Sequence, residues 1–140
     1  MLCGNSTNLY SKYLSKNHVD LRNIFKVGDS FSVTHSIEDK HSYKPASTKK
    51  HTVLSTHNMI YMAEDLCSDN LEEKLPPKHT SVGYYVDFTH GEPVPTGNKI
   101  KINAKVTNID KKKITFKTEV YDQDKLISSG VHKRAVIQFD

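Results

Sequence analysis

The order of hydrophobic and polar positions becomes regular only from about residue 25. Apolar and polar residues alternate from Phe31 to Glu38, which predicts a strand with one buried face. A polar loop that contains proline is expected from Asp39 to about His51. Residues 1–24 show no clear period, so we expect a tail or a short helix outside the fold, followed by one domain over residues 25–140.

A helix is predicted over residues 56–75. Thr56 suits its N-cap, and the pair Pro76 and Pro77 stops it. With a step of about 100° per residue, one side of this helix is apolar and the opposite side is polar. The apolar side holds Thr56, Met59, Ile60, Ala63, Leu66, Cys67 and Leu71.

Strand patterns follow the helix over residues 82–90, 100–106, 114–120 and 126–139. Alternate residues from Val82 to His90 share one face, and the last pattern changes phase near Gly130, which predicts a bulge or a sharp coil there. A single helix cannot cover both faces of a five-stranded sheet. The prediction is therefore an α+β fold in which an antiparallel sheet of about five strands wraps around one long helix.

The composition fits a small globular domain and narrows the choice of partners. Apolar residues make up 36% of the 140 residues, which is enough to fold alone or as a dimer. No apolar stretch approaches the roughly 20 residues that cross a bilayer. The 20 basic and 16 acidic residues leave a net charge of +4 without basic runs, so nucleic acid is a weak candidate partner.

The cysteine and histidine content excludes two kinds of site. Cys3 and Cys67 alone make neither a disulfide scaffold nor a four-cysteine zinc site, and both are expected as reduced thiols, which favours the cytoplasm. The scarcity of acidic residues before residue 25 would also suit an organelle transit segment. The histidines are scattered without the spacing of a zinc pair, so no metal is predicted.

Glu64 and His90 stand where polar groups are unusual. Glu64 lies at the rim of the apolar helix face, about 40° from Ile60. A carboxylate moved out of water has a raised pKa, which suits a general base or a nucleophile. His90 ends a strand, and histidine exchanges protons near neutral pH and donates to an oxyanion. Alternatively, Glu64 only marks the end of the buried stripe, and His90 is a satisfied strand-end histidine.

Thr56 has a structural and a chemical interpretation. As an N-cap it only satisfies a backbone N–H group at the start of the helix. Its hydroxyl also lies beside further unsatisfied backbone N–H groups at the positive end of the helix dipole. Such a place can hold a thioester carbonyl or an anion.

At this point a resemblance becomes visible. The stretch Val53–Glu64, with a threonine followed eight residues later by a glutamate, resembles the helix start of the fluoroacetyl-CoA-thioesterase-like branch of the hotdog superfamily. Ser81–His90 is similar to that family's glycine-to-histidine strand, with Pro95–Gly97 in the following turn, and Gly130–Ile137 is similar to its final strand. The resemblance covers residues 27–139.

The resemblance implies a hotdog fold, usually a homodimer with sites at the subunit interface, and hydrolysis of small acyl-CoA thioesters. It assigns catalysis to Thr56, Glu64 and His90. Gly83 matches a glycine that lines the acyl site, and Arg134 matches a basic residue near the coenzyme A end. No cofactor is expected apart from the coenzyme A that is part of the substrate.

In the mechanism we expect, Glu64 activates water or attacks directly to form an anhydride, and His90 steers or protonates. Whether Thr56 is the nucleophile or an orienting group is left open. Lys133 and Arg134 would meet the phosphates of coenzyme A, unless they are ordinary solvated charges at a strand end.

One departure from the family pattern concerns the acyl group. The fluoroacetyl-specific enzyme has aromatic residues in the loop before the threonine, whereas Tyr43–His51 is polar and basic and has no phenylalanine. Fluoroacetyl selectivity is therefore not carried over. Two other functions on the same fold stay open: a hydratase or dehydratase of acyl thioesters, and a non-catalytic acyl-CoA-binding module.

Overall fold

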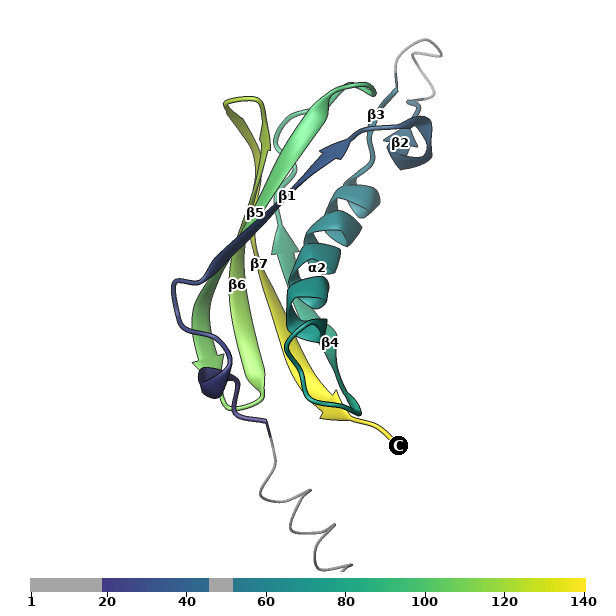
Figure 1. The fold of residues 1–140 in the computed structure, drawn as a ribbon. Helices are drawn as coiled ribbons and strands as arrows, with labels where there is room; N and C mark the ends of the chain where they lie inside the picture. Colours follow the sequence, from purple (N-terminus) through teal and green to yellow (C-terminus); the bar gives the residue numbers. More distant parts are fainter. Residues whose placement is uncertain (1–18, 46–51) are drawn as a thin grey trace, which may run out of the picture.

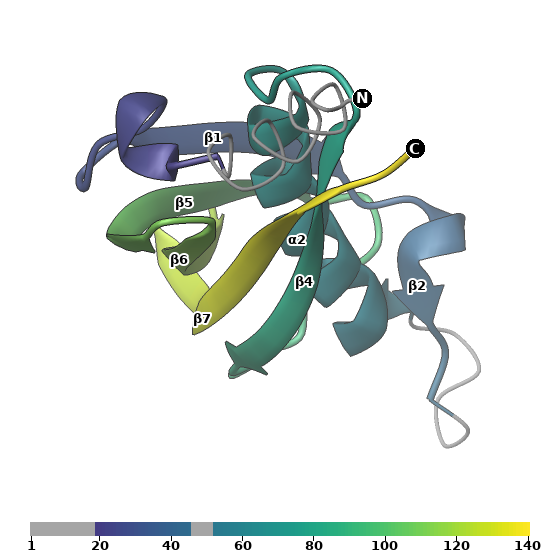
Figure 2. The same ribbon diagram turned by 90° about the horizontal axis from the view of Figure 1, so that it is seen from below.

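The fold is described from a computed structural model, which covers residues 19–45 and 52–140. Five antiparallel strands form one sheet in the order β1-β5-β6-β7-β4 (Figure 1). Its strands are β1 (Ser30–Ser36), β4 (His79–Phe88), β5 (Lys99–Asp110), β6 (Lys113–Asp122) and β7 (Lys125–Gln138). The sheet curves around a single long helix, α2, as the view from below shows (Figure 2). This is the architecture that the sequence predicts.

The helix α2 spans Thr56–Glu72 and begins one residue earlier than a Thr56 cap would require. Ser55 is the N-cap: its backbone is extended and its hydroxyl accepts a hydrogen bond from the backbone N–H of Asn58 at 3.3 Å. The prediction of Thr56 as the cap is therefore wrong by one residue, because serine and threonine adjoin and either can cap. The Thr56 hydroxyl is left for another partner.

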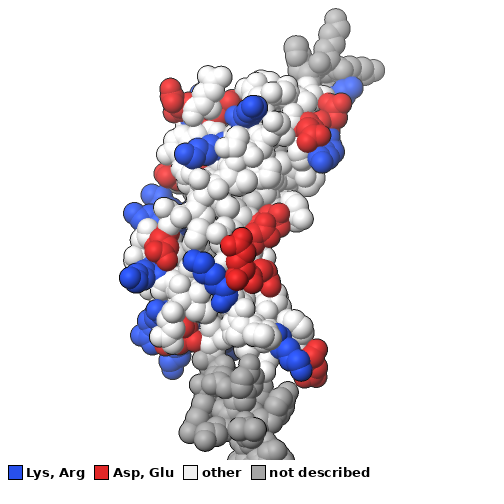
Figure 3. Space-filling view, in the orientation of Figure 1, with Lys and Arg blue, Asp and Glu red and all other residues white. Residues whose placement is uncertain are grey.

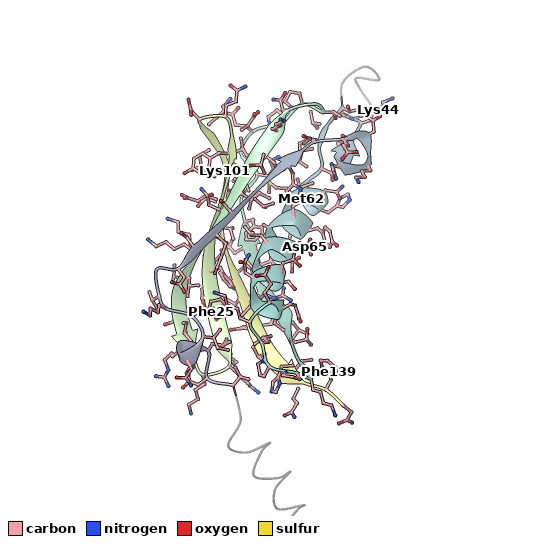
Figure 4. All side chains as sticks on the ribbon, viewed as in Figure 1. Phe25, Lys44, Met62, Asp65, Lys101 and Phe139 are labelled. Carbon is pink, nitrogen blue, oxygen red and sulfur yellow. The ribbon has the colours of Figure 1, made fainter. Side chains whose placement is uncertain are left out.

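The core lies between α2 and the concave face of the sheet. Met62 is buried there, whereas Asp65 is exposed on the side of α2 away from the sheet (Figure 4). Buried alternate positions of β5 and β6 face the helix, and the lysines between them, such as Lys101, face solvent. The buried helix residues are Met59, Met62, Ala63, Leu66, Cys67 and Leu71.

The domain starts before residue 25. Leu21, in the short 3-10 helix η1 (Leu21–Asn23), is fully buried, and its backbone N–H donates to the carbonyl of Lys111 at 2.8 Å. The segment 19–24, which the sequence analysis placed outside the fold, is thus part of it. The few apolar residues of so short a segment do not form a periodic pattern in the sequence. The rest of the expected tail lies outside the described residues.

The segment before the helix is less irregular than predicted. It contains a second 3-10 helix, η2 (Asp39–His41), and a small two-stranded sheet formed by β2 (Ser42–Tyr43) and β3 (Val53–Leu54). This small sheet brings Tyr43 to the N-terminal end of α2. Within residues 19–45 and 52–140, no helix is long and apolar enough to cross a membrane.

The predicted bulge near Gly130 lies elsewhere. The register of β6 against β7 shifts between Val120 and Tyr121, which leaves Ile127 of β7 as the extra residue, while Gly130 pairs regularly with Thr118 and Phe88. Gly130 is needed for a different reason. A Cβ atom there would overlap the Asp87 carbonyl and the Phe88 side chain, so the glycine permits close approach of β4 and β7.

The strand β4 forms an edge of the sheet and exposes apolar side chains on both of its faces. A second register shift, between Gly83 and Tyr85, breaks the expected alternation of Val82 to His90. Val82, Tyr84, Tyr85 and Val86 are 41–49% exposed. The expectation that alternate residues from Val82 to His90 share one face is therefore wrong, and the buried residues of β4 are His79 and Ser81.

Candidate active site

Thr56 and His90 meet at the N-terminal end of α2. The Oγ1 atom of Thr56 lies 2.9 Å from Nδ1 of His90, which follows the end of β4 by two residues. Because Ser55 caps the helix, the Thr56 hydroxyl is free to make this contact. A hydroxyl paired with an imidazole is the arrangement in which a base can activate a nucleophile or orient a substrate.

A cavity of about 620 Å³ lies against this pair. Besides the pair, much of its lining is apolar, and it includes Tyr43, which is 57% exposed. A mostly apolar cavity with a few converging polar groups is typical of a small-molecule site. The lining residues are Tyr43, Val53, Leu54, Ser55, Thr56, His57, Ile60, His90, Gly91, Glu92 and Pro93.

Burial favours the neutral form of His90. Burial lowers the pKa of its imidazole below the ordinary value of 6.5, and the nearby backbone of Glu92 offsets this only in part. Its Nε2 atom is buried and has no hydrogen bond of good geometry to the part of the chain that the structure describes. A neutral imidazole beside a hydroxyl can accept a proton, which a charged one cannot.

Glu64 does not join this pair within the chain. Eight residues of α-helix separate it from Thr56, which is about 12 Å along the axis. The imidazole next to Glu64 is that of His132, with its Nε2 atom 3.8 Å from Oε2 of Glu64. The Glu64 side chain is 34% exposed, in agreement with the expected rim position.

Gly83 faces Glu64, His132 and Arg134. A Cβ atom at Gly83 would lie 2.9 Å from Cε1 of His132, 3.1 Å from Oε2 of Glu64 and 3.2 Å from Nη1 of Arg134. Because Gly83 has no side chain, these three side chains pack directly over its backbone, and this point of convergence is here called the Gly83 gap. The Glu64 carboxylate and the Arg134 guanidinium therefore face the same point on β4. The structure brings these predicted residues together as a second polar centre.

Arg134 and Lys133 point to opposite faces of β7. The Arg134 guanidinium is buried: its Nε donates to the Ser81 hydroxyl at 2.8 Å and its Nη2 to the Ser81 carbonyl at 2.9 Å. Lys133 lies over the ring of Tyr85, 4.8 Å from its centre. The two cations therefore do not form one phosphate-binding pair within the chain, because adjacent residues of a strand face opposite ways.

Ser81 and His132 were missed by the sequence analysis. His132 is fully buried on β7 and shares a face with Arg134 and Val136. The signal was present, since these polar residues alternate in phase with an apolar one. It was overlooked because the resemblance singled out the arginine alone.

Comparisons with known proteins identify a family that the chain resembles. A sequence model described as fluoroacetyl-CoA-specific thioesterase (FlK) matches residues 37–140. The curated fluoroacetyl-CoA thioesterase of Streptantibioticus cattleyicolor is 26% identical over 88 residues, which is 63% of each protein. The match thus spans less than two thirds of that relative's length.

Solved structures share the fold. The fluoroacetyl-CoA thioesterase FlK superposes with a TM-score of 0.74 at 22% identity, covering 81% of this chain and 89% of that one. A hot-dog-like protein from Thermanaerovibrio acidaminovorans gives 0.79 at 18% identity, covering 87% and 90%. These likenesses confirm the predicted hotdog fold.

Proposed function

The chain belongs to the fluoroacetyl-CoA-specific thioesterase family, and from this premise we propose that it hydrolyses a small acyl-CoA thioester to the free acid and coenzyme A. The observation that carries the proposal is the 2.9 Å contact between Thr56 and His90 against the cavity. In this proposal the Thr56 hydroxyl oxygen attacks the thioester carbon while His90 accepts its proton. The carbon–sulfur bond breaks, the coenzyme A thiolate takes the proton from His90, and the acyl group remains as an ester on Thr56. No cofactor is needed beyond the coenzyme A of the substrate.

Glu64 is proposed as the base that activates water. A water held against the Glu64 carboxylate would donate a hydrogen bond to it and pass its proton to it on attack. The water attacks the carbonyl carbon of the acyl ester on Thr56, which releases the free acid and restores the Thr56 hydroxyl.

The two polar centres lie about 12 Å apart along α2, and we propose that a homodimer brings them together. The edge of β4 is free in the described sheet, and its exposed apolar residues Val82, Tyr84, Tyr85 and Val86 suit a second copy of the chain. Antiparallel pairing of two such edges would carry His90, just beyond the end of one β4, towards Gly83 of the other. Thr56 and His90 of one protomer would then act beside Glu64 of its partner.

Charge favours the β4 side for the coenzyme A phosphates. Acidic side chains gather on the exposed face of α2, where Asp65, Asp69 and Glu72 lie (Figure 3). A phosphate would be repelled there. Lys133 and Lys113 stand over the rings of Tyr85 and Tyr84 at the β4 side, and we propose that Lys133 contacts a phosphate.

The acyl group is proposed to be small but not restricted to fluoroacetyl. The polar loop on which this rests, Tyr43–His51, lies partly outside the described residues. A panel of acetyl-, fluoroacetyl-, propionyl-, butyryl- and hexanoyl-CoA with a free-thiol readout would test the activity. Free coenzyme A separates hydrolysis from hydration, and tight binding without thiol release would indicate a binding module instead.

The Glu64→Gln substitution tests the proposed base. We expect turnover to fall about a hundredfold or more, the scale of a lost acid–base group. Asp69→Asn is the matched control, because Asp69 is an exposed carboxylate on the same helix. Near-normal turnover of the Glu64→Gln variant would remove Glu64 from the mechanism.

A mixing experiment tests the arrangement across two protomers. Thr56→Val and Glu64→Gln variants are each expected to be inactive alone. If one site uses Thr56 of one protomer and Glu64 of the other, mixed dimers contain one complete site, and activity returns to about a quarter of wild type. No recovery after verified subunit exchange would show that both residues act within one chain.

A further inference from the structure

His132 is a buried titratable residue for which the proposed mechanism has no step. It belongs to β7, and its ring is fully inaccessible to solvent between the backbone of β4 and the Arg134 guanidinium. Its Nδ1 atom is 2.9 Å from the backbone carbonyl of Tyr85. A carbonyl oxygen can only accept, so the proton of this hydrogen bond belongs to Nδ1.

The other ring nitrogen must be unprotonated. Nε2 of His132 lies 3.2 Å from Nη1 of Arg134, and a guanidinium has donors but no acceptor. Nε2 therefore accepts with its lone pair, which defines a neutral imidazole with its proton on Nδ1. A second proton would place two cations in contact inside the protein.

The surroundings agree with a neutral ring. Arg134 on the same strand and Glu64 on α2 are the charged groups that face it, and Tyr85 and Phe88 of β4 contribute a carbonyl and an aromatic ring. Burial lowers the pKa of His132, and this effect exceeds the opposing influence of Glu64. In the neutral form Nε2 offers no proton to Glu64 at 3.8 Å, so that carboxylate keeps its acceptors.

The hydrogen bond to His132 holds the third nitrogen of the Arg134 guanidinium in place. Ser81 holds Nε and Nη2 of the guanidinium, and His132 holds Nη1, the nitrogen nearest to the Gly83 gap. Among the described residues, no carboxylate lies within 4 Å of Arg134. Without the acceptor on His132, Nη1 would be free to turn towards Glu64 and form an ion pair that occupies both groups.

We propose that His132, as its neutral Nδ1–H tautomer, is a positioning residue that holds Arg134 beside the Gly83 gap and apart from Glu64. This rests on the proposed thioesterase function only for its effect on turnover. The tautomer and the position of Arg134 are properties of the free protein. One nitrogen of the ring anchors it to β4, and the other orients the guanidinium.

Two substitutions separate the two ring nitrogens. Asn at position 132 keeps a donor near the place of Nδ1 but has no acceptor that reaches Arg134. Gln places its amide oxygen near the position of Nε2 and can still accept from Arg134. We expect His132→Asn to lower kcat by about ten- to a hundredfold with little change in KM, and His132→Gln to stay within about threefold of wild type. His35→Asn, on β1, controls for loss of an imidazole.

The readout that needs no substrate is nitrogen NMR of histidine-labelled protein. The resonance of His132, assigned by its loss in the His132→Gln variant, should show a protonated Nδ1 and an unprotonated Nε2 at neutral pH. A protonated Nε2, or an imidazolium, would overturn the proposal even if the protein is a thioesterase. Equal kcat for the Asn and Gln variants would overturn it as well.

A failed thioesterase assay has a different signature. If wild type releases no thiol from any acyl-CoA tested, the proposed function fails, and the Nη1–H resonance of Arg134, the group that His132 holds, decides on positioning. It should be slow to exchange in wild type and in His132→Gln and broadened in His132→Asn. An unchanged Arg134 resonance in both variants would refute the positioning role.

Discussion

Replacing Gly83 by alanine adds one methyl group at the point where three side chains converge. The new Cβ would lie 2.9 Å from Cε1 of His132, whereas nonbonded carbon atoms prefer about 3.5–4.0 Å. His132 is fixed by Tyr85 and Arg134 by Ser81, so neither can retreat without breaking a hydrogen bond. A shift of about half an ångström to one ångström follows, and misplacement on that scale costs about ten- to a hundredfold in rate.

The assay is kcat/KM for acetyl-CoA, measured on protein whose folding has been checked by circular dichroism. We expect the loss above, together with a stability cost of about 1–3 kcal/mol from overpacking. Gly91→Ala is the stability control, because its Cβ would meet only the Ile127 carbonyl, at an ordinary 3.7 Å. If Gly83→Ala retains wild-type kcat/KM and the His132 resonances do not move, the reasoning that places the Gly83 gap in the site is wrong.

The other predictions concern the hydroxyl, the strand contact and pH. Thr56→Ser should keep most of the activity and Thr56→Val should lose about a hundredfold, since only serine retains the hydroxyl that contacts His90; equal thiol release from both would exclude that hydroxyl. Gly130→Ala should lower the free energy of unfolding by about 3 kcal/mol or more, because its Cβ would lie 2.8 Å from Cα of Phe88 and closer still to other atoms of β4. Chemical denaturation measures this loss, and an unchanged unfolding midpoint would contradict it. Burial lowers the pKa of His90 and His132 below 6.5, so the unfolded chain binds more protons in that range and stability should fall as pH drops from about 7 to 5. Thermal melts should show this, with a shallower slope for His132→Gln, and a slope equal to that of wild type would count against the shift at His132.

The fold was largely predictable because its elements have strong periods. The helix carries an apolar stripe bounded by a serine-threonine pair and by two prolines, and β5 alternates lysine with buried residues. The parts that failed have mixed or short signals. On β4 an inserted residue near Tyr84 reverses the phase, and an edge strand with two exposed apolar faces resembles a buried strand in sequence. Leu21 is buried in a segment whose apolar residues, Val19, Leu21 and Ile24, are too few to give a regular period.

The candidate site was predictable as a set of residues but not as an arrangement. Thr56, Glu64, His90, Gly83 and Arg134 all lie near the helix-facing side of the sheet, yet they divide into two centres. Sequence separation along a helix gives the distance between Thr56 and Glu64 directly, at about 1.5 Å per residue. The identity of the imidazole that faces each of them depends on strand register, which the inserted residue in β4 changes. A sequence pattern cannot supply that register.

The position of the helix cap affects both the stability of the fold and the arrangement of the candidate site. Had Thr56 been the cap, its hydroxyl would accept a backbone N–H of the first turn and would be a poor nucleophile or orienting group. The structure gives that task to Ser55, which is 5% exposed and also accepts from the Asn58 side chain at 2.7 Å. Thr56 is then the first residue of the helix and its side chain is exposed towards His90. A Ser55→Ala substitution should therefore lower stability by about 1 kcal/mol through the lost cap. It should also lower turnover, because the Thr56 hydroxyl becomes the only capping oxygen available and divides its time between the helix and His90. Loss of stability without any loss of turnover would show that the two roles are independent.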